Sequence, residues 1–153
     1  MSSLRAIDTV VNIWTPEALS HRPSWRDGFF VDKMKAADTL MSGLSLEQMI
    51  ERMDRAGVER AFLVATKAGR LGHPSTYHLP PKVVADAVQK HPDRFYGLIG
   101  VDPYEGMTGV RAMERAVREY GFIGAHLYPH WFELAPDHAK YYPFYAKCCE
   151  LDV

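Results

Sequence analysis

The sequence has very little cysteine. Its only two cysteines are the neighbours Cys148 and Cys149 in a chain of 153 residues. Adjacent cysteines seldom bridge each other, and two cysteines cannot build the disulfide framework of a small secreted domain. The chain also lacks a run of the ~20 apolar residues that a membrane helix needs, and its start shows no apolar signal segment. These absences favour a reducing compartment, and the cytoplasm fits best.

An excess of charge of either sign is also missing. The chain has 18 basic and 19 acidic residues, which gives a net charge of -1 with 7 histidines counted as neutral. Without a basic stripe, neither nucleic acid nor a membrane is expected as a partner. A Gly-rich phosphate loop and a G-x-S-x-G elbow are absent as well. The remaining composition, 47% hydrophobic and 24% charged, predicts one domain over residues 1–153 that buries a sizeable core.

Short apolar runs supply the first structural signal. The first one, from Leu4 to Trp14, has the pattern of a buried strand that Thr15-Pro16 ends, since proline cannot donate to a ladder. Runs that are nearly continuously apolar are typical of a parallel sheet covered on both faces. The predicted strands are residues 5–12, 60–65, 95–101 and 122–128.

Helical patterns lie between and after these strands. Ser45 and Gln48 form a capping-box signature, and Gly57 is a good C-terminal stop for that helix. Pro143 predicts that the last helix is bent or begins late. The predicted helices cover residues 45–57, 80–92, 107–121 and 136–152. This alternation of strand and helix indicates an α/β protein built from βα units.

Two long connections interrupt the regular alternation. Residues 16–44 follow the first strand and have no clean periodicity, and residues 66–79 follow the second strand. Long connections in a small domain are usually functional or mobile. In a barrel or an open parallel sheet, loops at this edge help to build a pocket, so we expect both segments near a binding site.

Three segments in order carry a family resemblance: "AGVERAFLV", "HPDRFYGLIGVDP" and "GFIGAHLYPHW". They resemble the amidohydrolase-2 group of the amidohydrolase superfamily, which contains metal-dependent hydrolases and non-oxidative decarboxylases of the aminocarboxymuconate-semialdehyde type. The resemblance implies a TIM-like (β/α) barrel, of which this chain is the N-terminal half with about four βα units. It also implies hydrolysis or decarboxylation of a small carboxylated or aromatic acid, with the site at the C-terminal ends of the strands.

The first strand departs from the family pattern. The family reads D-x-H-x-H there, and its two histidines hold a divalent metal such as zinc. The matching residues in this chain are Asp8, Val10 and Asn12. Valine cannot bind a metal, and asparagine offers only a carbonyl oxygen, which suits hard cations better than zinc. The resemblance therefore leaves the cofactor unknown, and we assign no metal ligand.

Candidate catalytic residues follow the fourth strand. His126 shares one strand face with Gly124 and Tyr128 if the side chains alternate, and His130 lies one loop further out. We predict His126 and His130 as catalytic residues, because the C-terminal end of a barrel strand favours chemistry. The alternative for His126 is a core histidine bonded to a backbone carbonyl.

Candidate substrate-binding residues are Asn12, Trp14 and Tyr128. Asn12 could donate a hydrogen bond to a substrate oxygen, or it could instead tie down the loop that follows. Trp14 suits a pocket wall, although packing within the loop explains it equally well.

Chain length raises the question of assembly. A full barrel usually needs ~250 residues, and this chain has 153. Four parallel strands leave two open edges and an uncovered concave face. Three explanations stay open, namely a truncated product, two copies that close one barrel, or an open sheet. We expect a homo-oligomer, and the alternative function is a non-catalytic half-barrel that self-associates or binds a small ligand.

Overall fold

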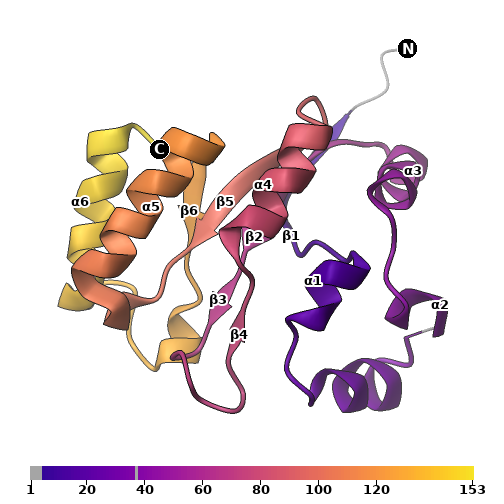
Figure 1. The fold of residues 1–153 in the computed structure, drawn as a ribbon, viewed down its shortest axis with the longest axis horizontal. Helices are drawn as coiled ribbons and strands as arrows, with labels where there is room; N and C mark the ends of the chain where they lie inside the picture. The colour runs from indigo at the N-terminus through magenta and orange to yellow at the C-terminus, as the bar shows by residue number, and fades with distance from the viewer. Residues whose placement is uncertain (1–4, 37) are drawn as a thin grey trace.

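The chain folds around one parallel sheet, seen in a computed structural model that describes residues 5–36 and 38–153. Leu4, where the first predicted strand begins, lies outside these residues. The strand order is β1-β2-β5-β6, and the sheet curls into half a barrel (Figure 1). The strands are β1 (Ala6–Val11), β2 (Val58–Ala65), β5 (Phe95–Gly100) and β6 (Gly124–His126). The four predicted strands are confirmed, although the fourth is shorter than residues 122–128.

The strand register brings the carboxyl ends of the four strands to one edge. Ala61 of β2 is opposite Phe95 of β5, and Leu98 of β5 is opposite Gly124 of β6. The pairing of β1 with β2 is parallel as well, with an irregularity between Asp8 and Val11. Because all four strands are parallel, the segments that follow them gather at the same end of the sheet.

Four main helices follow the strands. Ser45 and Gln48 form the expected capping box of the first, and Gly57 ends it with a φ of 72° in the left-handed region. Pro143 lies in the first turn of the last helix, which begins late, as predicted. None of the described helices is long and apolar enough to cross a membrane. The helices are α3 (Leu46–Ala56), α4 (Pro81–Lys90), α5 (Gly106–Tyr120) and α6 (Tyr142–Leu151).

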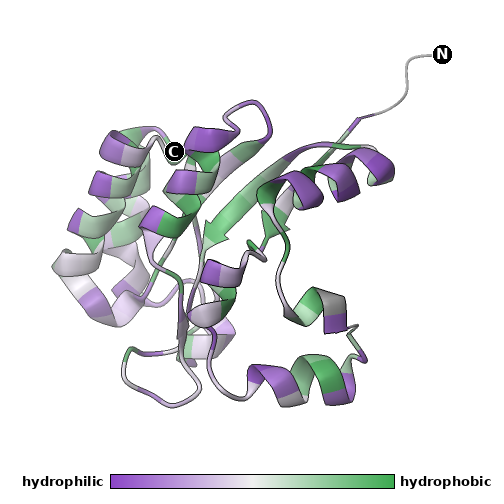
Figure 2. Cartoon of the chain, turned by 45° about the vertical axis from the view of Figure 1, so that its right-hand side comes forward, coloured by the Kyte–Doolittle hydropathy of each residue, from purple (hydrophilic) through white to green (hydrophobic). Residues whose placement is uncertain are grey.

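The hydrophobic core lies between these helices and one face of the sheet. The odd-numbered positions Leu63, Ala65, Phe95 and Ile99 belong to this core. Val64 is fully buried too, yet it lies outside that cluster, on the opposite face of β2. Figure 2 shows apolar strands behind helices whose outer surfaces are polar. The described helices pack on one face alone, yet Val64 and Leu98 on the other face are buried as well.

β1 is exposed rather than buried. Residues 6–10 are all exposed, including Ile7 at 52% and Val10 at 50%. The prediction of a buried first strand is wrong because β1 is an edge strand whose one hydrogen-bonded neighbour among the described residues is β2. The side chains of Ile7 and Val10 are therefore open to solvent.

The two long connections contain short elements that periodicity did not predict. Residues 16–44 hold α1 (Pro16–Ser20), a π-helix (Gly28–Lys33) and α2 (Asp38–Met41). Residues 66–79 form a small hairpin from β3 (Lys67–Ala68) and β4 (Tyr77–His78). Three short 3₁₀ turns complete the chain, at Pro103–Glu105, Pro129–Phe132 and Ala139–Tyr141. Both long connections lie at the carboxyl edge of the sheet (Figure 1).

We predict that Gly100→Ala destabilises the fold strongly. A methyl group at Gly100 would collide with the Ala65 carbonyl oxygen and would lie 2.6 Å from the Lys67 amide nitrogen. Backbone cannot move aside as a side chain can, so we expect a loss of ~1–3 kcal/mol in urea unfolding. Gly124→Ala is the matched control, because its methyl would lie 3.1 Å from the flexible end of Leu98. Equal losses in the two variants would contradict this account.

Candidate functional site

A pocket of about 480 Å³ lies at the carboxyl edge of the sheet. Its walls come from three places: the connection after β1, the hairpin after β2 and the loop after β6. The volume is in the range of small-molecule sites. The pocket is lined by Asn12, Arg22, Trp25, Phe29, Phe30, Thr66, Ala68, Ser75, Tyr77, Tyr128 and Trp131.

Polar side chains that follow three of the strands meet in this pocket. The Thr66 hydroxyl donates to the side-chain oxygen of Asn12 at 3.0 Å and is buried directly after β2. Tyr128 lines the same pocket after β6. Burial raises the pKa of Tyr128, and a hydrogen bond with Thr66 opposes that rise. Tyr128 therefore keeps its proton at neutral pH and can donate a hydrogen bond to a ligand.

Arg22 is held in an aromatic cage beside these groups. Its guanidinium carbon lies 4.6 Å from the ring centres of both Trp14 and Tyr77, and 5.5 Å from that of Phe30. The Arg22 Nε is buried without a hydrogen-bond partner among the described residues. Burial lowers the pKa of Arg22, and an electrostatic interaction with Tyr77 opposes that effect. Arginine remains charged in proteins, and the described residues that line the pocket include no acidic side chain to balance this cation.

Two tryptophans form the rim. The rings of Trp25 and Trp131 are stacked, with centres 6.3 Å apart and planes inclined by 19°. The Trp25 indole donates to the Ser75 carbonyl at 3.4 Å, which ties the first long connection to the hairpin. A flat apolar ligand would contact these rings while its polar groups reach Arg22 and Tyr128.

His126 lies next to the pocket without lining it. Its ring centre is 4.4 Å from that of Tyr128, which confirms that the two residues share a face. The His126 Nδ1 is buried and has no hydrogen-bond partner within the described part of the chain. Burial lowers the pKa of His126, so the imidazole is neutral at neutral pH. A neutral imidazole with a free nitrogen can accept a proton.

The remaining predicted site residues lie elsewhere. His130 is exposed and lines a neighbouring hollow of about 540 Å³ with Arg70 and His73. The Trp14 indole donates to the Leu40 carbonyl at 2.6 Å, and Trp14 supports the pocket through Arg22 rather than by lining it. Asn12 and Tyr128 line the pocket itself. The structure thus brings Asn12, Tyr128 and His126 together and places His130 apart.

The described residues do not fit a divalent metal site. No group of three or more His, Cys, Asp or Glu side chains comes together within residues 5–36 and 38–153. The Asn12 side-chain oxygen already accepts a hydrogen bond from Thr66, and the Val10 side chain has no atom that can bind a metal. Three protein ligands are usual in a catalytic zinc site, so we derive no step through a metal held by this chain alone.

Asp102 stabilises the backbone turn at the end of β5. Its carboxylate accepts a hydrogen bond from the Tyr104 amide at 2.8 Å and begins the short 3₁₀ turn there. Burial raises the pKa of Asp102, which is 2% exposed. Nearby, Lys67 pairs with Glu105 at 2.5 Å. These contacts fix the carboxyl end of β5 beside the hairpin.

A family model described as Amidohydrolase matches residues 7–153, so the chain belongs to the amidohydrolase family. The match covers all four sheet strands from Ile7 onward. No curated protein is similar enough to count as a match.

Several solved structures share the fold. A 5-carboxyvanillate decarboxylase from Novosphingobium aromaticivorans, complexed with manganese and 4-hydroxy-3-methoxy-5-nitrobenzoic acid, is 25% identical with a TM-score of 0.73. It is matched over 98% of this chain and 49% of its own. A TIM-barrel protein from Bordetella bronchiseptica is 20% identical with a TM-score of 0.65, over 96% and 52% of the two chains.

A third neighbour is a dihydroxybenzoic acid decarboxylase from Polaromonas sp. JS666, solved with manganese and 2-nitroresorcinol. It is 23% identical with a TM-score of 0.63, over 97% of this chain and 47% of its own. The chain thus spans about half the length of these barrels. The prediction of an α/β, TIM-like half-barrel of the amidohydrolase family is confirmed.

Sequence reasoning missed Arg22 and Thr66. Thr66 could have been found, since it directly follows the second predicted strand, where barrels place their functional groups. Arg22 could not, because it lies in a connection without periodicity and reaches Tyr77 across 55 residues of sequence. Its cage exists only when the first long connection and the hairpin fold together.

We predict that His126 makes the fold less stable at low pH. Because its pKa is lowered in the folded state, the unfolded chain binds more protons between that pKa and the usual value of about 6.5. The stability that neutral His126 contributes should therefore be fully present above the usual value and be lost as pH falls through this window.

The measurement is urea unfolding at pH 7.5 and pH 5.5 for the wild type and His126→Gln. We expect the variant to lose less stability between the two pH values. The control is His21→Gln, since His21 is exposed. If His126→Gln and His21→Gln change the pH dependence equally, the buried state of His126 is not its cause.

Proposed function

We propose that this chain supplies half of the active site of an enzyme that acts on a small aromatic carboxylic acid by non-oxidative decarboxylation. The observation that carries the proposal is the caged guanidinium of Arg22 in an aromatic pocket at the carboxyl edge of the sheet. Family membership supports an enzyme of this kind, and two solved neighbours are decarboxylases of hydroxylated benzoic acids.

The pocket suits an aromatic acid chemically. Arg22 offers a planar fork of donors that matches a carboxylate, and its unpartnered Nε would gain a charge-assisted hydrogen bond. Trp25 and Trp131 offer apolar faces to the ring. Tyr128 can donate to a ring hydroxyl. Binding would thus stabilise a cation that the free protein leaves without a counter-charge.

His126 is the residue that we propose for proton transfer. Decarboxylation leaves an electron pair on the ring carbon, and a proton must replace the departing CO₂. Neutral His126 can take a proton from water or from a ligand hydroxyl and pass it on. His130, which is exposed in the neighbouring hollow, is proposed only as a residue of the outer loop.

Binding without turnover is the second candidate function. It is favoured by one observation, that the described residues bring no three metal-ligating side chains together. In that case the half-barrel would hold the acid at Arg22 and leave it unchanged. The two candidates share the binding step and differ in whether CO₂ is released.

We predict that 4-hydroxy-3-methoxy-5-nitrobenzoic acid binds the wild type and that Arg22→Gln weakens this binding by about 10- to 100-fold. A hydrogen bond to a charged group contributes ~1.5–3 kcal/mol, and ~1.4 kcal/mol is tenfold. Isothermal titration calorimetry gives the affinity. Arg111→Gln is the matched control, since Arg111 is exposed on α5. Equal affinities for Arg22→Gln and Arg111→Gln would remove Arg22 from the site.

Turnover is tested separately by CO₂ release from 2,6-dihydroxybenzoate, with and without added Mn²⁺. The decarboxylase proposal expects release that His126→Gln reduces by at least about 100-fold, the lower range of general acid–base catalysis. Binding at Arg22 without any release in either condition would support the second candidate instead.

A further inference from the structure

The sheet has two open edges of matching polarity. β1 and β6 are the outer strands of the order β1-β2-β5-β6, and every pairing within it is parallel. A second copy related by a two-fold axis along the barrel would bring its β6 beside β1, and its β1 beside β6, both in parallel. The result is a closed sheet of eight strands, the number whose interior side chains can fill.

The concave face carries side chains that suit a barrel interior. Phe62 and Tyr96 lie on this face with ring centres 5.8 Å apart, and the Arg60 guanidinium donates to the Tyr96 hydroxyl at 2.7 Å. Val64 and Leu98 follow them along β2 and β5, and neither belongs to the core under the helices. Inward layers of bulky residues are what fills an eight-stranded barrel.

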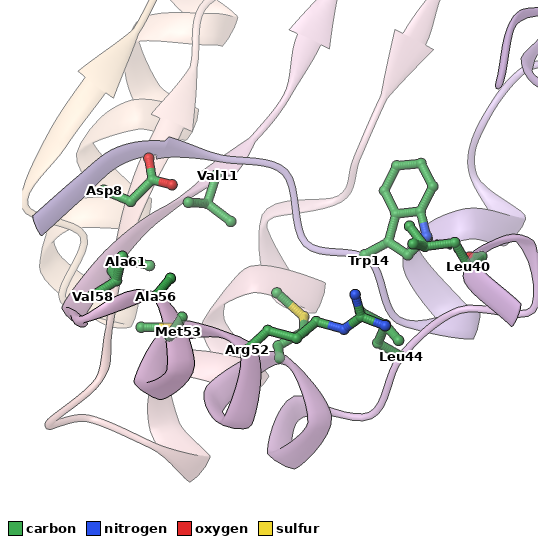
Figure 3. Close-up of a pocket in the computed structure, with 11 residues that line it drawn as sticks. Asp8, Val11, Trp14, Leu40, Leu44, Arg52, Met53, Ala56, Val58 and Ala61 are labelled. Atoms are coloured by element: carbon green, nitrogen blue, oxygen red, sulfur yellow. Dashed lines mark hydrogen bonds between the residues drawn. The ribbon is translucent and has the colours of Figure 1, made fainter. Parts of the chain in front are cut away.

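An apolar hollow lies beside the open edge at β1. It has a volume of about 380 Å³ between β1 and α3, with Asp8 and Arg52 as its two charged residues. Figure 3 shows Val11 above Met53 and Ala56, with Trp14 and Leu44 at the other end. The hollow opens beside the strand whose apolar residues are exposed, so a helix packed there would cover both.

A matching apolar stripe lies on α6. Tyr142, Ala146 and Cys149 are exposed at i, i+4 and i+7, and Val153 continues the same row just beyond the helix. Tyr142 is 56% exposed. The exposure of Cys149 differs from the buried thiol that is typical of free cysteine. Such a row on a helix is expected to face another element.

We propose that a second copy of this chain covers these surfaces. In a β/α barrel the helix after a strand packs near the next strand, so α6 of one copy would lie over β1 and the hollow of the other. In such a pair, the α6 stripe of each copy would contact the hollow of the other copy. A second copy is favoured over a foreign partner because one chain carries both complementary surfaces, the α6 stripe and the hollow beside β1. This proposal does not depend on the substrate or on turnover.

The two pockets would open at the same end of this closed barrel, since all eight strands are parallel. Each copy would then contribute to the wall opposite the other copy's Arg22 pocket. A bound aromatic acid would be less exposed in the pair than in the single chain.

The first test is the mass of the full chain in solution, measured by light scattering over a range of concentrations. The proposal expects a species of twice the monomer mass of 17.4 kDa. Hydrogen exchange of the same samples should show slower exchange for the amides of residues 6–11 as the pair forms. A monomer at every concentration, or a pair in which β1 exchanges as fast as in the monomer, overturns the proposal.

The second test uses two variants and a matched control. Ala146→Glu places a charge on the α6 stripe, and Val10→Lys places one on the exposed edge strand. Each should raise the dissociation constant of the pair at least about tenfold, because a charge buried without a partner is costly. Met107→Glu is the control, since Met107 is exposed on α5 and belongs neither to the α6 stripe nor to the residues that line the hollow. Circular dichroism confirms folding.

Each result bears on the proposal. Dissociation of the pair in both variants and not in the control supports it. A pair that resists Ala146→Glu, or that Met107→Glu weakens equally, contradicts the assigned surfaces. If Val10→Lys fails to fold, Ala146→Glu and the hydrogen exchange of β1 still decide the outcome. Binding of the aromatic acid by a strictly monomeric chain would leave the proposed function standing and remove this one.

Discussion

The parallel hydrogen bonding of four strands is the constraint on which the rest of the structure depends. It aligns the carboxyl ends of β1, β2, β5 and β6 at one edge, where Asn12, Thr66 and Tyr128 meet. It also sends the two long connections to the same edge, because each begins where a strand ends. The helices then cover one face of the sheet, and the β1 edge stays exposed.

The chemistry that we propose for the pocket depends on one charged side chain, the Arg22 guanidinium. Arg22 is stabilised by three aromatic rings instead of a carboxylate, so its Nε has no partner among the described residues. Cation–π contacts compensate for part of the lost hydration of this guanidinium. A neutral His126 lies next to Tyr128, and Tyr128 lines the pocket. The groups that we propose for anion binding and for proton transfer are thus adjacent but separate.

Local signals predicted the regular part of the fold well. Ser45, Gln48 and Gly57 marked the bounds of α3 because capping depends on neighbouring residues alone. The exposure of β1 was not predictable in that way, since its apolar run is the same whether the strand is central or at an edge. The Arg22 cage depends on contacts between distant segments, which periodicity does not record. The position of Asn12 and Tyr128 at this edge was predictable, because strand ends and side-chain alternation are visible in the sequence.

The central claim is that the Arg22 guanidinium receives the carboxylate of an aromatic acid. The most direct measurement is the ¹⁵N–¹H NMR signal of the Arg22 Nε–H group, assigned by its loss in Arg22→Gln and followed during addition of 4-hydroxy-3-methoxy-5-nitrobenzoic acid. The account predicts a downfield proton shift that saturates with binding, as a new charge-assisted hydrogen bond forms. A saturating shift elsewhere in the protein with this signal unchanged would contradict the account.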